Sequence, residues 1–162
     1  MTSEAKFNED ARFRWTKVAH GWISFALDGG SGQYRCTVSD ASDVMAELLL
    51  AVARIVRGSL EEQVSFDHEP TEIRWTLRRA TEKVSVSIES FERWGSNSGG
   101  HLKWLGNWSS TSDFGQEFLV ATESFLQDVG PDGYSSGWPS YSTPDHAIGD
   151  LKTSLNSAAT FD

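Results

Sequence analysis

The sequence has very little cysteine and no long hydrophobic run. Cys36 is the only cysteine among 162 residues, which excludes a disulfide within the chain. A small buried strand residue is its expected role. The longest apolar run, 48–53, is far too short to span a bilayer, and the first ten residues lack the apolar core of a signal peptide. We therefore expect a soluble, cytoplasmic protein.

The sequence also lacks the spaced motifs that carry most enzyme chemistry. No two of the four histidines are spaced three or four residues apart, as metal ligands on a helix are. Asp67, His68 and Glu69 form the only dense cluster of metal-ligating residue types, in a turn where adjacent side chains diverge. A nucleophile elbow, a phosphate loop and a dinucleotide fingerprint are absent. We therefore predict that the protein is not an enzyme and uses no metal or cofactor.

Basic residues are scarce, and the acidic excess is unevenly distributed. The chain has 14 Lys and Arg against 23 Asp and Glu, a net charge of −9. Residues 40–72 carry two basic and eight acidic side chains, and residues 113–162 carry one and eight. Such segments repel phosphate, which disfavours nucleic acid, and they attract a cationic partner. Solubility alone is the competing explanation for the charge.

A two-residue hydrophobic period runs through much of the chain. Ile73, Trp75 and Leu77 alternate with polar residues, which is typical of a strand with one buried face. The same alternation predicts strands at 17–27, 33–38, 64–66, 73–78 and 84–89, with a sixth at 101–107. The glycine-rich stretch 28–32 is a turn, because glycine tolerates a positive φ.

A helical period replaces the alternation in three segments. The first follows cap candidates at 39–42, carries a wide apolar stripe from Val44 to Val56, and ends at Gly58. The second begins at Ser112 or Asp113 and is expected to end at 130–133. An aromatic loop, 134–141, then leads to a short third helix that starts at Pro144.

Together these elements predict one α+β domain. It has one antiparallel sheet of five to six strands in the order ββαβββ(β), one helix packed on the sheet and two C-terminal helices. Residues 1–16 are an N-terminal arm or an extra strand. Residues 17–109 contain the sheet and first helix, and residues 113–156 contain the C-terminal helices and the aromatic loop.

Two groups of side chains have both a structural and a functional interpretation. Arg74, Arg78 and Lys83 are either a small anion-binding patch or, as we favour, partners in cross-strand ion pairs with Glu62, Glu72 or Glu89. The seven tryptophans are numerous for this length. Trp75 is expected in the core, whereas those in irregular segments either close a second small core or form a contact surface. These four are Trp94, Trp104, Trp108 and Trp138.

Several short patterns are similar to those of small uncharacterised bacterial domains. They are Trp22-x-x-Phe25-x-Leu27, Val38-Ser39, Val56-Arg57-Gly58, Glu69-Pro70, Arg74-Trp75-x-Leu77, and Gly133-Tyr134 with Trp138. In character such domains resemble the small acidic immunity proteins of bacterial polymorphic toxin systems. The matching part covers about 21–88 and the loop near Tyr134. The resemblance implies an α+β domain that binds another protein, and it carries over no functional residues.

We therefore predict a bacterial protein-binding module that docks a basic protein, such as a cationic toxin, and binds neither nucleic acid nor membrane. The candidate contact residues are Asp67, Glu69, Glu72, Asp132, Tyr134, Trp138 and Asp145. One alternative is a ligand-binding or enzymatic domain with a pocket on the polar sheet face, lined by Arg74, Arg78 and Trp22. A second alternative is a homodimer that associates through the sheet face.

Overall fold

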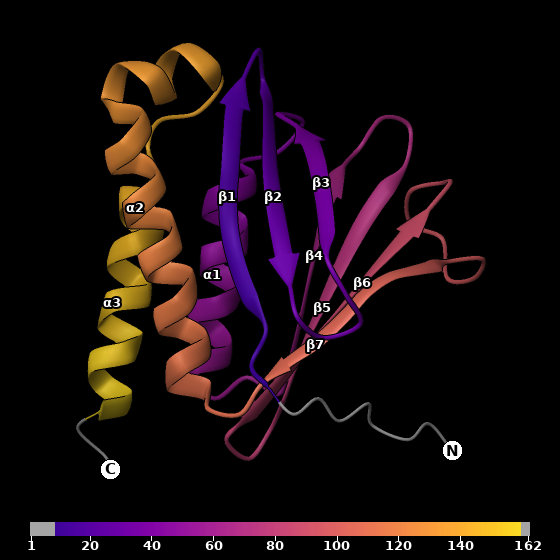
Figure 1. Cartoon of the computed structure of the whole chain (residues 1–162), viewed down its shortest axis with the longest axis vertical. Coiled ribbons are helices and arrows are strands. Elements are labelled where there is room, and N and C mark those ends of the chain that lie inside the picture. Colours follow the sequence, from indigo (N-terminus) through magenta and orange to yellow (C-terminus); the bar gives the residue numbers. More distant parts are fainter. Residues whose placement is uncertain (1–8, 160–162) are drawn as a thin grey trace.

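Three strands precede the first helix and four follow it in the computed structural model, which describes residues 9–159 (Figure 1). The strands are β1 (Arg12–Ala19), β2 (Trp22–Asp28), β3 (Tyr34–Ser39), β4 (Glu61–Asp67), β5 (Glu72–Ala80), β6 (Lys83–Phe91) and β7 (His101–Trp108). The helices are α1 (Val44–Arg57), α2 (Thr111–Gly137) and α3 (Asp145–Ala159). The predicted α+β class and its three helices are confirmed.

The strands form two antiparallel sheets, so the prediction of one sheet of five to six strands is wrong. One sheet has the order β1-β2-β3 and the other the order β4-β5-β6-β7. The segment 17–27 is not one strand, because the chain reverses at His20 and Gly21, both with positive φ, and β1 pairs with β2. The extra-strand interpretation of the N-terminal segment holds for Arg12 onward, while residues 1–8 lie outside the described residues.

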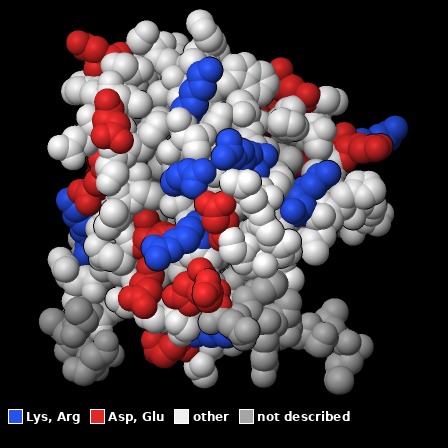
Figure 2. All heavy atoms as spheres, in the orientation of Figure 1, with Lys and Arg blue, Asp and Glu red and all other residues white. Residues whose placement is uncertain are grey.

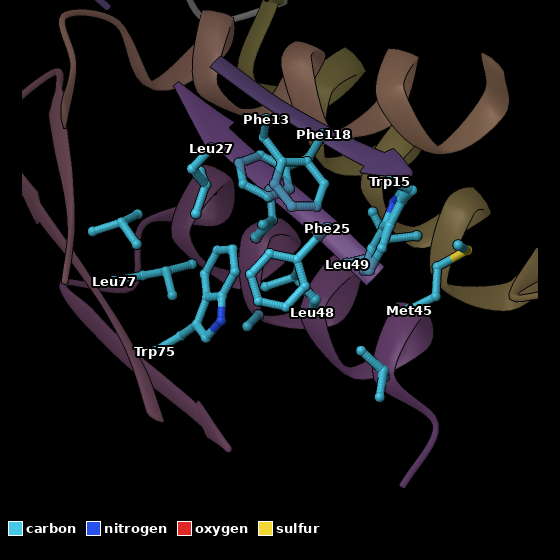
Figure 3. Packing of buried hydrophobic residues seen from close by; sticks show 14 of the residues in the cluster. Phe13, Trp15, Phe25, Leu27, Met45, Leu48, Leu49, Trp75, Leu77 and Phe118 are labelled. Carbon is cyan, nitrogen blue, oxygen red and sulfur yellow. The ribbon is translucent and has the colours of Figure 1, made fainter. Parts of the chain in front are cut away.

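Side chains from both sheets and all three helices meet in one hydrophobic core, part of which Figure 3 shows. The Phe13 ring of β1 stacks on Phe118 of α2, with centroids 4.3 Å apart. Phe25 of β2 meets Trp75 of β5 at 5.2 Å, edge to face. Leu48 adds the buried face of α1. The two sheets therefore face each other, and contacts between aromatic side chains of the two sheets stabilise their packing.

The turn between β2 and β3 holds the free edge of β7. The Ser31 amide donates to the Leu105 carbonyl at 2.7 Å, and the Trp104 indole donates to the Gly32 carbonyl at 2.8 Å. The Ala11 amide donates to the Asn107 carbonyl at 3.0 Å, just before β1 begins. An exposed strand edge is prone to unwanted pairing, and these contacts cover this one.

Helix α2 covers the outer edge of β1. The Phe13 amide donates to the Glu117 carboxylate at 2.9 Å, and the Trp15 indole donates to the Thr122 hydroxyl at 3.0 Å. More of the surface of helix α1 is buried than the predicted apolar stripe alone, because α3 also packs against this helix. As a result, Ala51 and Ala53 are buried too.

The predicted end of the second helix is wrong in part. Gly130 has non-helical angles, φ 72° and ψ 166°, yet the helix resumes and continues to Gly137. Pro131 follows the break, where a residue without an amide hydrogen begins a helical turn at no cost. This extra helical segment occupies the first part of the expected aromatic loop and carries Tyr134 into the core.

Candidate functional site

Four connections between elements lie toward one end of the molecule, at the top of Figure 1, where the α2–α3 link and the β4–β5 turn stand on opposite sides. They are the β1–β2 turn, the β3–α1 link, the β4–β5 turn and the α2–α3 link. Main-chain hydrogen bonds join three of them, because Gly21 accepts from the Asp40 amide at 3.0 Å and donates to the Gly137 carbonyl at 2.9 Å. The Ser39 hydroxyl donates to Asp67 at 3.1 Å and ties in the β4–β5 turn.

Five carboxylates lie on or beside three of these connections, and the β1–β2 turn carries none. We call Asp40, Asp67, Glu69, Asp132 and Asp145 the acidic end. Glu69, Asp132 and Asp145 are exposed, and Asp40 and Asp67 are half-buried. Asp67 also orders its turn, since it accepts from the Glu69 amide at 3.0 Å. Asp40 accepts from the Ser140 hydroxyl at 2.6 Å. The sequence pattern indicated Asp40 only as one of the cap candidates at 39–42 before the first helix.

The acidic end is uncompensated by basic side chains. Within residues 9–159, none of its five carboxylates forms an ion pair. Basic side chains pair with other carboxylates instead, for example Arg57 with Asp150 at 2.9 Å and Lys152 with Glu123 at 3.0 Å. In Figure 2, Lys and Arg side chains cross the upper middle of the face, in the region of β1-β2-β3.

Three of the predicted contact residues are buried, which corrects the prediction that they meet a partner. Glu72 is 2% exposed, Tyr134 1% and Trp138 0%. Tyr134 and Trp138 lie on and just beyond the resumed helical segment, which turns both rings into the core. Burial raises the pKa of Tyr134 above its ordinary value, and the nearby Asp43 carboxylate raises it further. Tyr134 is therefore a neutral core residue at physiological pH.

The loop tryptophans are mostly core residues. Trp104 and Trp108 are each 1% exposed, and the Trp108 ring meets Phe114 with centroids 5.0 Å apart. Trp94, by contrast, is 51% exposed in the β6–β7 loop. Trp94 is thus the one large aromatic of this group that reaches the surface among the residues described.

The predicted anion patch is largely occupied by ion pairs. Arg74 donates to Glu72 on its own strand, with Nε 2.8 Å from the carboxylate, and its guanidinium lies 4.0 Å from the centre of the Phe91 ring. Arg78 pairs across the strands with Glu61 at 3.4 Å. Lys83 is half-buried at the start of β6. Arg78 therefore forms a cross-strand ion pair, but with Glu61, which is not one of the three predicted partners. Arg74 pairs with the predicted Glu72, which lies two residues away on the same strand.

The Glu72 carboxylate is the hub of a buried polar network, and its removal is expected to destabilise the fold. It accepts from Ser65 Oγ at 2.6 Å and from the Gly95 amide at 2.9 Å, besides Arg74. Burial by itself raises the pKa of Glu72, but these hydrogen bonds outweigh burial and lower it. We expect Glu72→Gln to cost about 1–3 kcal/mol of unfolding free energy at pH 7, measured by urea denaturation.

The pH dependence of this difference follows from the direction of the shift. A lowered pKa in the folded state stabilises the fold above the ordinary pKa of the carboxyl group, and this stabilisation disappears as the pH falls through the folded-state pKa. The gap between the parent and Glu72→Gln should therefore narrow in acid. The matched control is Glu61→Gln, which removes an exposed ion pair and should cost at most about 1 kcal/mol. Equal costs for the two variants would contradict the network.

The alternative pocket of Arg74, Arg78 and Trp22 is not formed. Trp22 lies on β2, beside a shallow hollow of about 270 Å³ that Lys17 and His20 also line. Arg74 and Arg78 lie on β5, in the other sheet. Sequence reasoning placed all three on the polar face of one sheet, and the division into two sheets separates them.

Comparison of the chain with protein-family models, with curated proteins and with solved structures finds no match. Among residues 9–159, no three His, Cys, Asp or Glu side chains are placed to hold a metal ion. None of the described helices combines the length and the apolar character needed to cross a membrane.

Proposed function

We propose that this protein is a non-catalytic binding module that docks a basic protein through its acidic end. The observation that carries the proposal is a set of five carboxylates along one end of the molecule, none of which forms an ion pair among the described residues. Like charges held together repel one another and weaken the fold unless a cation joins them. A partner with a positive surface relieves that repulsion and is steered toward this end.

The acidic end also suits a protein partner rather than a small cation. Its carboxylates lie on or beside three of the four connections, and no three metal-ligating groups meet among the residues described. Glu69, Asp132 and Asp145 are exposed, as residues at the rim of an interface are. A cationic toxin, neutralised by this module as its immunity protein, is the specific partner class that we propose.

Affinity capture with a charge-neutralised variant tests the proposal. The parent, immobilised at low and at moderate salt, should retain a basic protein from cells of the source organism. Glu69→Gln, Asp132→Asn and Asp145→Asn combined should weaken that affinity by about tenfold or more, mainly through slower association. Increasing salt should weaken the parent complex in the same direction.

A matched variant separates the acidic end from net charge. Glu82→Gln, Glu92→Gln and Asp113→Asn combined remove three exposed carboxylates elsewhere on the surface and should leave the affinity unchanged. The proposal is contradicted if the parent retains no basic protein at either salt concentration. Equal weakening by both triple variants contradicts it as well, because it reports net charge alone. Killing by the captured protein, and rescue by the parent, would support the toxin assignment.

A further inference from the structure

A cleft opens between the two sheets where β3 faces the β4–β5 turn and the neighbouring ends of β5, β6 and β7. Its volume is about 280 Å³, just below the usual range of about 300–1,000 Å³ for small-molecule sites. Tyr34, Arg35 and Cys36 line one side, and His68, Ser90 and Lys103 line the other. We call this space the inter-sheet cleft. It shares no residue with the acidic end.

The charge around the inter-sheet cleft is opposite to that of the whole protein. Arg35 and Lys103 are exposed at its mouth, and neither forms an ion pair within residues 9–159. None of the residues that line the cleft carries a carboxylate. Seven of the nine arginines in the described chain pair with a carboxylate, so an unpaired Arg35 that shares a carboxylate-free cleft with Lys103 calls for an explanation. An anion between them supplies it.

A hydroxyl without a hydrogen-bond partner lies at the floor of the inter-sheet cleft. Ser90 is 7% exposed, lines the cleft, and makes no hydrogen bond among the described residues. The Ser90 oxygen is not enclosed by protein atoms, so it is open to the cleft and available to a ligand atom that enters from the mouth. Ile73, beside it on β5, adds an apolar surface.

The other side chains of the inter-sheet cleft are neutral or already fixed. Burial raises the pKa of the Cys36 thiol and also that of the Tyr34 hydroxyl, so both keep their protons at physiological pH and add no negative charge. His68 is anchored, because its Nδ1 hydrogen-bonds to the Thr37 carbonyl. Nδ1 therefore carries the proton, which leaves Nε2 for a ligand.

We propose that the inter-sheet cleft binds a small organic anion, in which a phosphate or carboxylate group lies beside an apolar body. Arg35 and Lys103 hold the anionic group at the mouth, and the Ser90 hydroxyl bonds to the ligand at the floor. The apolar body contacts Tyr34 and Ile73. The cleft adjoins the acidic end at the β4–β5 turn, where His68 stands between Asp67 and Glu69, but the two proposals are tested with different residues and ligands, so either can fail without the other.

Titration of the isotope-labelled full chain with three probes, followed by amide NMR shifts, tests the proposal. Phenyl phosphate and benzoate carry the two anionic groups on one ring, and phenol carries neither. Saturable shifts are expected with at least one anionic probe at residues 34–37, 68–71, 90 and 103, and the stronger probe identifies the anionic group. Phenol should produce none. Absence of saturable shifts with both anions overturns the proposal, and so does equal binding of phenol.

Variants separate a built site from general charge attraction. Arg35→Gln with Lys103→Gln should weaken binding by about tenfold or more, because each lost contact is a hydrogen bond to a charged group. Lys17→Gln with Arg93→Gln removes two exposed, unpaired cations outside the inter-sheet cleft and should leave the affinity unchanged. Ser90→Ala should weaken binding without a change of charge. Equal effects of the two double variants, or full affinity in Ser90→Ala, overturn the assignment.

Discussion

Trp75→Ala is expected to cost about 3–5 kcal/mol of unfolding free energy, one of the largest losses available to a single substitution in this chain. Trp75 is 0% exposed on β5, at the point where the two sheets meet. Its ring contacts aromatic rings from both sheets and from α2, with centroids 5.2 to 6.4 Å away. Removal of the indole leaves a cavity among rigid rings that cannot collapse to fill it.

The measurement is guanidinium unfolding followed by circular dichroism, with Trp94→Ala as the control. Trp94 is 51% exposed, so its removal should change stability by no more than about 0.5 kcal/mol. A total stability of about 5–15 kcal/mol is usual, so at the low end of this range Trp75→Ala leaves too little stability to measure. Trp75→Phe, which keeps part of the ring volume, then serves instead and should lose about 1–3 kcal/mol. Equal losses at Trp75 and Trp94 would contradict the two-sheet core.

The burial of Trp75 was predictable because a strand's side chains alternate between faces. The pattern of Ile73, Trp75 and Leu77 records one buried face, and all three are buried. The stripe of the first helix was predictable for the same kind of reason, since its period matches the helical turn. Periodicity in the sequence therefore located the core-facing residues of most elements.

The division into two sheets was not predictable from the same pattern. Alternation records which face of a strand is buried, but not which strand supplies its hydrogen bonds. The reversal at His20 and Gly21 was hidden, because a short turn inside an apolar run resembles a continuous strand. The ion pair of Arg74 was not predictable for a similar reason. Glu72 accepts hydrogen bonds from both Arg74 and the Gly95 amide of the β6–β7 loop, and the alternation of side chains does not indicate where that loop lies.

The candidate site was predictable in part. Glu69, Asp132 and Asp145 are exposed at one end, as surface carboxylates in turns usually are. Their position at the same end of the molecule as Asp40 depends on contacts between segments that are distant in the sequence. The hydrogen bond from Ser140 to Asp40 is one such contact, and no local pattern indicates it. Tyr134 and Trp138 were misplaced because a proline after glycine signals the end of a helix, whereas here the helix restarts.

Gly30→Ala is expected to cost about 3 kcal/mol or more, through the joint between the two sheets. Gly30 has a φ of +57°, and a Cβ atom there meets the Leu105 carbonyl oxygen at 2.2 Å and the Gly106 Cα at 2.8 Å. Both are backbone atoms of β7, so no side chain can rotate out of the way. The turn must withdraw and lose hydrogen bonds to β7, each worth about 1 kcal/mol, in addition to the cost of alanine at positive φ.

Gly32→Ala separates the two parts of this cost. Gly32 lies in the same turn with a φ of +131°, but a Cβ atom there meets nothing within 4 Å. Gly32→Ala should therefore lose only the free energy needed to hold alanine at a positive φ, about 1 kcal/mol. The difference between the two variants in urea unfolding measures the contact with β7 alone. Equal losses would mean that the turn is not held against β7, and the two sheets would then be joined by their aromatic core without this second contact.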